Sequence, residues 1–385
     1  MSKYLDYSII KEDFLPSWRQ LYDKAEPFAT NLLNLLPLVA PLPYPFQTKL
    51  IASYALTPSA LASILPILIF YGQRGTGKSS LGQLISYLHG IQIHTGADTF
   101  AAIRNDLNDR RWKTIAMEGN DPAYPTIFRT IEVNTMMVWD DIDAKMLIEQ
   151  PNIFRMLKSG YNKETDTISL ADGSGENKRF NCFSPKICST TTPIWGDSRF
   201  AELERRILVI KFGKAQFEPI VKLDNWNWHG FNQLFIDYWN SLDRAKNWLA
   251  SRKKLGEIFS NNTRTTIILD IAATGLSTGI WKSTDEVKDY FSEYWSWYEE
   301  EIAYGDSALC GLLKKYIFEL EQNRYSVIDL FGLSQDEIDP VALKKQIDSW
   351  NKQGMLEVTP TNSLVSQTMN YLGWRLIPGK WIKMK

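Results

Sequence analysis

Hydrophobic positions along the chain follow two periods, and the alternation between them predicts how the chain is organised. From about residue 47 to 215, short apolar runs alternate with stretches of helical spacing, which is typical of a mostly parallel sheet covered by helices on both faces. The strands predicted there span residues 65–71, 135–140, 186–190 and 206–212. An α/β fold is therefore expected for this region.

The residues before and after this region have other patterns. Residues 1–46 combine an amphipathic start, from Phe14 to Tyr22, with a proline-rich stretch at 37–45 that we expect to be extended. Together they predict an N-terminal arm or collar. Over 216–305 the pattern is helical and aromatic, and we interpret this part as a helical lid or linker.

The last segment, 306–385, predicts helices at 306–322 and 340–353, followed by Gly354 and short strands near 356–358 and 374–384. Two helices, a glycine turn and a terminal β-ribbon in this order resemble a winged helix. We therefore expect a winged-helix-like domain at the C-terminus.

A complete phosphate-binding sequence follows the first predicted strand. Residues 72–79 read G-Q-R-G-T-G-K-S, which matches G-x-x-x-x-G-K-[ST], and helical spacing continues after it. Gly72, Gly75 and Gly77 allow backbone N–H groups to turn toward phosphates, which the N-terminus of the following helix also attracts. Lys78 is expected to reach the β- and γ-phosphates, and the Ser79 hydroxyl to bind Mg²⁺. The sequence thus predicts a site for ATP and Mg²⁺.

Two carboxylates end the second predicted strand, about sixty residues beyond the loop. Asp140 is expected to hold the Mg²⁺ ion, and Asp141 to act as a general base or to orient a water in line with the γ-phosphate. After the third strand, Thr191 and Thr192 are candidates for positioning that water. Alternatively, these threonines only end a strand before a proline, where β-branched residues are common.

Arginines near the last strand are candidates for a role in catalysis. Arg205 or Arg206 is expected to act as an arginine finger that reaches the γ-phosphate of a neighbouring subunit. The alternative is that the two arginines pair with Glu202 and Glu204. Arg264, at the start of a later helical pattern, is a candidate second sensor of the nucleotide or an ordinary helix-start residue.

The order of phosphate loop, acidic strand, polar strand and arginine resembles that of AAA+ ATPases. Within that class, the paired Asp140 and Asp141 and the ending from Glu202 to Phe212 are similar to superfamily 3 and related helicases, including virulence-associated E-type and poxvirus-type primase-helicase proteins. The similarity covers about residues 60–215 and departs at the polar strand, where superfamily 3 members usually carry Asn. The resemblance implies an AAA+ motor that forms a homo-oligomer, with a hexamer as the expected form.

Residues 160–186 predict a hairpin, because two β-prone arms flank Asp-Gly-Ser-Gly. In the helicases that this chain resembles, a hairpin at this point lines the pore of the ring and grips single-stranded DNA. Lys163, Lys178 and Arg179 are the candidate phosphate contacts. Alternatively, they belong to a surface hairpin and offset its acidic residues. Basic residues of the C-terminal segment either touch duplex DNA or form a solvated face: Lys344, Lys345, Lys352, Arg375, Lys380, Lys383 and Lys385.

Composition limits the number of domains, the class of protein and its expected location in the cell. With 385 residues, 44% hydrophobic and 23% charged, the chain is long enough for two or three domains. A net charge of −1 excludes the global basicity of a passive nucleic-acid binder, so any DNA contact is expected to be local. The cysteine pattern predicts neither disulfides nor a zinc ribbon and fits a cytoplasmic location. The apolar stretch at 61–71 is too short to cross a membrane, and no signal sequence is evident.

These features favour an ATP-dependent, ring-forming DNA helicase that acts on single-stranded or forked DNA in the replication of a mobile or viral element, with a primase or polymerase as candidate partner. The strongest alternative is an AAA+ switch, such as a helicase loader, replication initiator or transposition regulator, which assembles on DNA without unwinding it. A third interpretation is a P-loop kinase with a small substrate, in which the hairpin and the arginines have no role.

Overall fold

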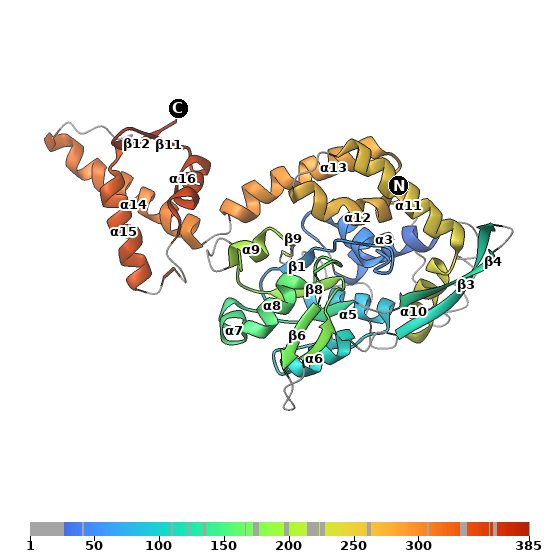
Figure 1. The fold of residues 1–385 in the computed structure, drawn as a ribbon. Coiled ribbons are helices and arrows are strands. Elements are labelled where there is room, and N and C mark those ends of the chain that lie inside the picture. The colour runs from blue at the N-terminus through green and yellow to red at the C-terminus, as the bar shows by residue number, and fades with distance from the viewer. Residues whose placement is uncertain are drawn as a thin grey trace. The chain divides into compact units, whose positions relative to one another are not determined.

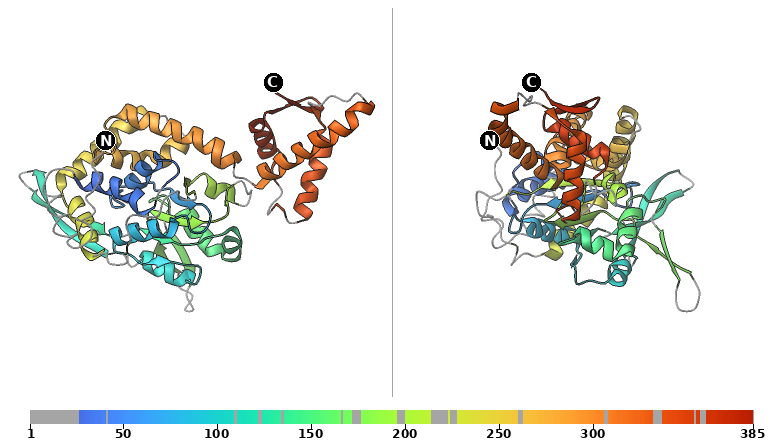
Figure 2. Two further views of the ribbon diagram at one scale, coloured as in Figure 1. Left: turned by 180° about the vertical axis from the view of Figure 1, so that it is seen from behind. Right: turned by 90° about the vertical axis from the view of Figure 1, so that its left-hand side faces the viewer.

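The fold is described from a computed structural model (Figures 1 and 2). By its internal contacts the chain divides into unit 1, Met1–Thr192 with Arg205–Lys288, and unit 2, Pro193–Glu204 with Asp289–Lys385. The expected amphipathic start at the N-terminus lies outside the described residues. The structure describes residues 27–40, 42–108, 111–121, 124–133, 136–165, 167–171, 177–195, 200–213, 223, 228–259, 263–305, 308–331, 337–353, 355–356 and 360–384.

The centre of unit 1 is a parallel sheet with the strand order β2-β5-β8-β1-β9 (Figure 1). All of β8, and all but the last residue of β1 and β9, are buried, as expected for parallel strands covered on both faces. The α/β fold predicted from the apolar runs is therefore confirmed. The strands are β1 (Ile67–Tyr71), β2 (Ile93–His94), β5 (Met137–Trp139), β8 (Lys186–Thr190) and β9 (Ile207–Lys211).

Helices cover this sheet. The first after the phosphate loop is α5 (Lys78–His89), which packs against β2, β5 and β8 and ends at Gly90, whose φ of 63° caps the helix. On its other side, α5 contacts α10 (Trp228–Trp239). Other helices of unit 1 are α3 (Pro27–Val39), α4 (Gln47–Ala55), α6 (Phe100–Asn108), α7 (Ala144–Glu149), α8 (Pro151–Ser159), α11 (Leu242–Ile258) and α12 (Thr263–Ser277).

The proline-rich stretch departs from the expectation of an extended tether. Pro37 lies inside α3, near its C-terminal end, and its ring is exposed. A proline inside a helix removes one backbone hydrogen bond. Leu32, Leu35 and Leu36 of this helix are fully buried, and burial of such side chains stabilises the helix by more than the missing bond costs.

Two β-hairpins project from unit 1 (Figure 2). The pair β3 (Arg111–Asp121) and β4 (Tyr124–Val133) was not anticipated from the sequence. The pair β6 (Thr167–Ala171) and β7 (Asn177–Asn181) is antiparallel and lies within the stretch where a hairpin was predicted.

A buried lysine joins the two ends of the β6–β7 hairpin. Lys186, at the start of β8, is 1% exposed, and its ammonium donates to three backbone carbonyl groups. These belong to Gly160 before the hairpin, at 2.6 Å, and to Cys182 and Ser184 after it, at 2.8 and 3.0 Å. A side chain at Gly160 would place its Cβ 2.1 Å from the Cys182 carbonyl oxygen. The hairpin is thus closed at its base by a charge that its backbone satisfies.

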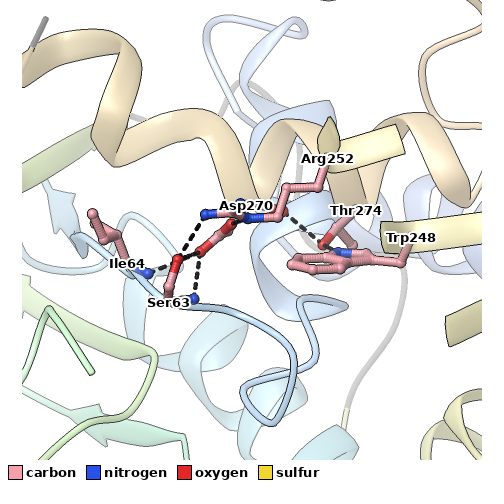
Figure 3. Close-up of polar contacts among 6 residues, drawn as sticks. All are labelled: Ser63, Ile64, Trp248, Arg252, Asp270 and Thr274. Carbon is pink, nitrogen blue, oxygen red and sulfur yellow. Dashed lines mark hydrogen bonds and ion pairs between the residues drawn. The ribbon is translucent and has the colours of Figure 1, made fainter. Parts of the chain in front are cut away.

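A second polar cluster attaches α11 and α12 to the chain just before β1 (Figure 3). Asp270 of α12 is 1% exposed, and its carboxylate accepts hydrogen bonds from the backbone N–H groups of Ser63, at 2.6 Å, and Ile64, at 2.8 Å. Arg252 of α11 completes the cluster, because its Nε lies 2.5 Å from the same carboxylate and its Nη2 donates to the Ser63 hydroxyl at 2.8 Å. The buried carboxylate of Asp270 therefore has several partners, as stability requires.

Unit 2 has its own core, formed by side chains such as Leu313, Ile347, Trp350, Trp374 and Trp381. Its small sheet is antiparallel, with the order β10-β12-β11. The helix α16 was not expected from the sequence. Described elements of this unit are α9 (Ala201–Glu204), η2 (Tyr298–Gly305), α14 (Ala308–Phe331), β10 (Glu337–Ile338), α15 (Pro340–Lys352), α16 (Asn362–Tyr371), β11 (Trp374–Ile377) and β12 (Lys380–Lys383), while α13 (Thr284–Trp297) contains the boundary between the units.

Among the helices that the structure describes, none combines the length and the apolar character that a membrane span requires.

Candidate functional site

The phosphate-binding sequence forms the turn between β1 and α5. Its first residue, Gly72, lies so close to the chain after β9 that a Cβ atom there would be 2.4 Å from the Phe212 carbonyl oxygen. Its last glycine, Gly77, has a φ of 92° and faces Ala40, with 3.0 Å between a hypothetical Cβ and the Ala40 Cβ. Only glycine fits both requirements without strain. The loop thus begins and ends against neighbouring segments.

The side chain of Lys78 is folded back onto the loop. Its ammonium donates to the backbone carbonyl groups of Gly72, at 2.6 Å, and Gln73, at 2.7 Å, and the residue is 7% exposed. Burial lowers the pKa of Lys78 from its usual value, while the nearby carboxylates of Asp140 and Asp141 act in the opposite direction. A buried ammonium held by neutral carbonyl groups is favourably placed to gain an anionic partner.

The two predicted acids follow β5 directly. Asp140 is held through its backbone N–H, which donates to the His94 carbonyl of β2 at 2.8 Å. Asp141 is exposed and has a φ of 63°, a left-handed conformation that few residues other than Gly, Asn and Asp adopt. Uncommon backbone conformations of this kind gather at functional sites.

Ser189, near the end of β8, joins both acids and was missed by the sequence reasoning. Its hydroxyl donates to the Asp140 carboxylate and accepts from the Asp141 backbone N–H at 2.9 Å. Ser189 is 5% exposed, so this contact is shielded from water. The signal that would have identified it is the strand register. Trp139 lies opposite Cys188, which places the next residues, Asp140 and Ser189, side by side.

The loop, the acids and Ser189 surround one open cleft of ≈ 390 Å³, within the range of about 300–1,000 Å³ that is usual for ligand sites. Hydroxyl and carboxylate oxygens from Ser79 and Asp140 share the cleft, and these are the ligands that Mg²⁺ prefers. The residues therefore fit a triphosphate with a magnesium ion. The cleft is lined by Arg74, Gly75, Thr76, Gly77, Lys78, Ser79, Ser80, Asp140, Asp141, Ser189 and Thr191.

The two candidate threonines differ in position. Thr191 lines the cleft, as a residue that positions a water would have to. Thr192 is exposed, and its backbone N–H and carbonyl are both hydrogen-bonded to the hydroxyl of Thr190, at 3.2 and 2.7 Å. The structure thus gives Thr191 a position in the site and Thr192 a position in the turn that follows β8.

The two candidate arginines also differ. Arg206 is half-buried, donates to the Lys158 carbonyl at 3.1 Å and lies over the Tyr161 ring, 4.5 Å from its centroid. Arg205 is exposed. Neither Arg205 nor Arg206 is among the described residues that line the cleft, and the expectation that one of them acts on a neighbouring subunit stays a prediction. Arg264, in the first turn of α12, is exposed and also lies outside the cleft lining.

The candidate DNA contacts lie on the hairpin and at its base. Lys178 and Arg179 are exposed neighbours on β7, so their side chains leave opposite faces of the ribbon. Lys163 instead donates to the Ala60 carbonyl at 2.9 Å and lies 5.6 Å from the centroid of the Phe183 ring. It contributes to the attachment of the hairpin in this structure.

Basic residues of unit 2 were considered for contact with duplex DNA. Lys344 and Lys345 of α15 and Arg375 of β11 are exposed. Lys380 pairs with Glu337 at 2.5 Å, within the small sheet. Lys385 lies outside the described residues.

Comparisons with known proteins identify no family for this chain. No family model matches the chain, and no curated protein does. Among solved structures, the chain is similar to a full-length MCM homolog from Methanopyrus kandleri, with 11% sequence identity and a TM-score of 0.38. The similarity covers 76% of this chain and 62% of that one. A likeness at this level carries no argument about function, which has to come from the residues of the cleft.

Proposed function

We propose that the chain is an ATPase of the AAA+ class that drives a ring-forming DNA helicase in the replication of a mobile or viral element. The observation that carries the proposal is the cleft itself. The phosphate loop, the two acids of the strand end and the Ser189 hydroxyl all meet in one cleft at the carboxyl edge of the parallel sheet. Ligands of α/β sheets bind at that edge.

Six residues of the cleft have catalytic or binding roles in this proposal. Lys78 leaves its carbonyl partners to neutralise the β- and γ-phosphates. Ser79 and Asp140 hold Mg²⁺, which when bound supplies positive charge to the phosphate oxygens. Ser189 fixes the orientation of the Asp140 carboxylate through its hydrogen bond. Asp141 takes the proton of the attacking water, and Thr191 helps to hold that water in line.

The strand order supports the AAA+ class. The polar strand β8 lies between β1, which carries the phosphate loop, and β5, which carries the acids. In this arrangement β8 contacts the nucleotide site at one end, through Ser189, and the hairpin at the other end, through Lys186. A change at the γ-phosphate therefore has a short path to the hairpin, along the part of β8 from Ser189 to Lys186.

Contact with DNA is proposed for the β6–β7 hairpin, through Lys178 and Arg179. Unit 2 is proposed as a winged-helix domain. Two observations support this proposal. The elements of this unit follow the order α14, β10, α15, α16, β11, β12, and the first short strand, β10, pairs with the last, β12. Exposed lysines on α15 supply positive charge for a phosphate backbone.

Assembly is proposed to be a homo-oligomeric ring, expected to be a hexamer, in which Arg205 of one subunit serves the cleft of the next. The exposed position of Arg205, against the packed position of Arg206, favours Arg205 as the finger.

The test is ATP-dependent displacement of a labelled strand from a forked DNA duplex, measured together with ATP hydrolysis. Lys78→Ala removes the ammonium that would neutralise the phosphates, so it should abolish both activities. Its circular dichroism spectrum should equal that of the wild type, which shows that the fold is unchanged. Lys145→Ala, at a lysine whose side chain is 80% exposed, is the matched control and should be fully active.

Three other results would change the proposal. DNA-stimulated hydrolysis without displacement would favour the AAA+ switch, such as a loader, initiator or transposition regulator. Hydrolysis by a monomer that ignores DNA would favour the kinase. Unimpaired turnover in Lys78→Ala would contradict the site assignment itself.

A further inference from the structure

The proposed triphosphate has a base at its other end, and the strand order indicates on which side of the loop that base lies. Asp140 directly follows β5 and Ser189 lies on β8; both strands lie on one side of β1, while β9 lies on the other side. The γ-phosphate has to face the acids for hydrolysis. The nucleoside therefore leaves the loop on the β9 side. This step rests on the proposed function.

The chain between α3 and α4 lines that side of the loop. Ala40 lies against Gly77, and Pro43 lies against Gly213, where a Cβ atom would be 3.3 Å from the Pro43 Cγ. Gly213 directly follows Phe212, the residue against which Gly72 packs. The side of the phosphate loop away from the acids thus meets the segment that leads into α4.

Gln47 begins α4, just after this segment, and its amide has no use in the fold. Its backbone N–H turns back to the Tyr44 carbonyl at 3.0 Å. The side chain is 0% exposed, and neither its Nε2 nor its Oε1 has a hydrogen-bond partner among the described residues. A buried donor and a buried acceptor left unpaired both cost free energy, so such a group calls for a ligand that satisfies them.

We propose that the Gln47 carboxamide recognises the adenine base of the bound nucleotide. A carboxamide offers one acceptor beside two donors, and adenine presents the complementary pair, the N6 amino group beside the N7 acceptor. Guanine presents two acceptors, O6 and N7, at the same edge. One of them would face the Gln47 oxygen. Gln47 thereby selects ATP over GTP.

The experiment compares the binding of ATP, GTP and inorganic tripolyphosphate to the full chain by titration calorimetry. Tripolyphosphate reports the phosphate loop without a base. Gln47→Met is the test variant, because methionine is unbranched and of similar length but has no amide. Since it removes a buried, unpaired group, it should fold at least as stably as the wild type.

The wild type should bind ATP about tenfold or more tightly than GTP, as expected for one well-placed bidentate contact. Gln47→Met should bind ATP about as weakly as GTP and keep its affinity for tripolyphosphate. Purine riboside triphosphate, which keeps N7 but lacks the N6 amino group, should bind to the wild type more weakly than ATP does and should lose less affinity than ATP in Gln47→Met.

Asn31→Leu is the matched control. Asn31 also has a buried amide nitrogen without a partner, but it lies on α3 eight residues before Val39, or about 12 Å along the helix. Its ratio of ATP to GTP affinity should equal that of the wild type.

Three outcomes would overturn the inference. They are an unchanged ratio in Gln47→Met, a loss of tripolyphosphate binding in a folded Gln47→Met protein, and an equal change in Asn31→Leu. A wild type that binds neither ATP nor tripolyphosphate would instead contradict the proposed function.

Discussion

At the scale of single residues, Ser189 has the most direct consequence for activity. Its hydroxyl holds the Asp140 carboxylate and the Asp141 backbone. Ser189→Ala removes both contacts of a hydroxyl whose residue is only 5% exposed. We expect kcat for ATP hydrolysis to fall about ten- to a hundredfold, because loss of one buried hydrogen bond to a charged group costs about 1.5–3 kcal/mol. Steady-state hydrolysis with excess Mg²⁺ measures this.

Thr192→Ala is the comparison for this variant, because Thr192 is exposed and outside the cleft lining. It should retain nearly full turnover. If Thr192→Ala hydrolyses ATP more slowly than Ser189→Ala, the catalytic role assigned to Ser189 belongs to Thr192, three residues further along. Thr192 would then be the threonine that positions the water.

At the scale of elements, His89 makes the packing of α5 sensitive to acid. Its ring is buried, shares a hydrogen bond of 2.8 Å with the Ala55 carbonyl of α4, and lies 4.5 Å from the Phe235 ring of α10. Burial lowers the pKa of His89 from 6.5 to about 4. Between these values the unfolded chain binds a proton that the folded chain does not, so stability falls as the pH falls from 6.5 to about 4.

The expected loss over this window is about 3 kcal/mol. Urea unfolding of the wild type and of His89→Gln at pH 7 and pH 4.5 gives the contribution of the imidazole as the difference between the two proteins. The gap between their stabilities should shrink or reverse at the lower pH. A gap that does not change with pH would show that His89 titrates normally in the folded chain.

Asp270 is the second element-scale test, because it attaches α12 to the chain before β1 (Figure 3). Asp270→Ala leaves two backbone N–H groups and Arg252 without their acceptor. Since the Arg252 side chain is 35% exposed, part of this loss is made up by water, and we expect destabilisation of about 2–4 kcal/mol.

Asp270→Asn keeps one acceptor oxygen and should lose less stability than Asp270→Ala in urea unfolding. Asp243→Ala, at an exposed residue in the first turn of α11, is the control and should change stability little. Equal losses for Asn and Ala at position 270 would mean that the charge, and not the hydrogen bonds, stabilises the cluster.

The elements that the sequence predicted best are those with continuous apolar runs. The limits of β8 agree with the expected ones, and α5 begins at the end of the phosphate loop, where helical spacing was expected to continue. The two-residue strand β2 has too few residues to show a period. The α3 helix was missed because Pro37 outweighed the leucines in the pattern.

Only those residues of the candidate site that belong to a motif within one segment of the sequence could be predicted. Lys78, Ser79 and Asp140 carry recognisable motifs, and the structure places them around one cleft. Ser189 does not carry a motif. Its role depends on the register between β5 and β8, and register between strands far apart in sequence cannot be read from either strand alone.

At the scale of the whole molecule, the two arginines test whether subunits share a site. If Arg205 is the proposed finger, Arg205→Ala should bind ATP but hydrolyse it poorly, because the substitution removes a charge that would stabilise the transition state in the next subunit. Arg206→Ala should mainly lower stability, because Arg206 packs on Tyr161 and on the Lys158 carbonyl. ATP binding, hydrolysis and thermal unfolding of each variant separate the two roles.

Mixing subunits supplies the control. Arg205→Ala and Lys78→Ala are inactive in different halves of the shared site, so a mixture should regain part of the turnover at hybrid interfaces. Turnover that stays at the level of the separate variants, at every mixing ratio, would rule out a finger that acts between subunits.

The ammonium of Lys186 also bears on how such a protein changes over generations. It holds the two ends of the hairpin together at Gly160, Cys182 and Ser184, while β7 also contacts α6, where the Arg104 guanidinium lies 3.9 Å from the centroid of the Phe180 ring. Recombination that replaced the segment 167–181 with the arm of another motor would leave the catalytic edge of the sheet in place. We therefore expect diverged descendants of this gene to differ in the strands of the hairpin before they differ at Lys186 and Gly160.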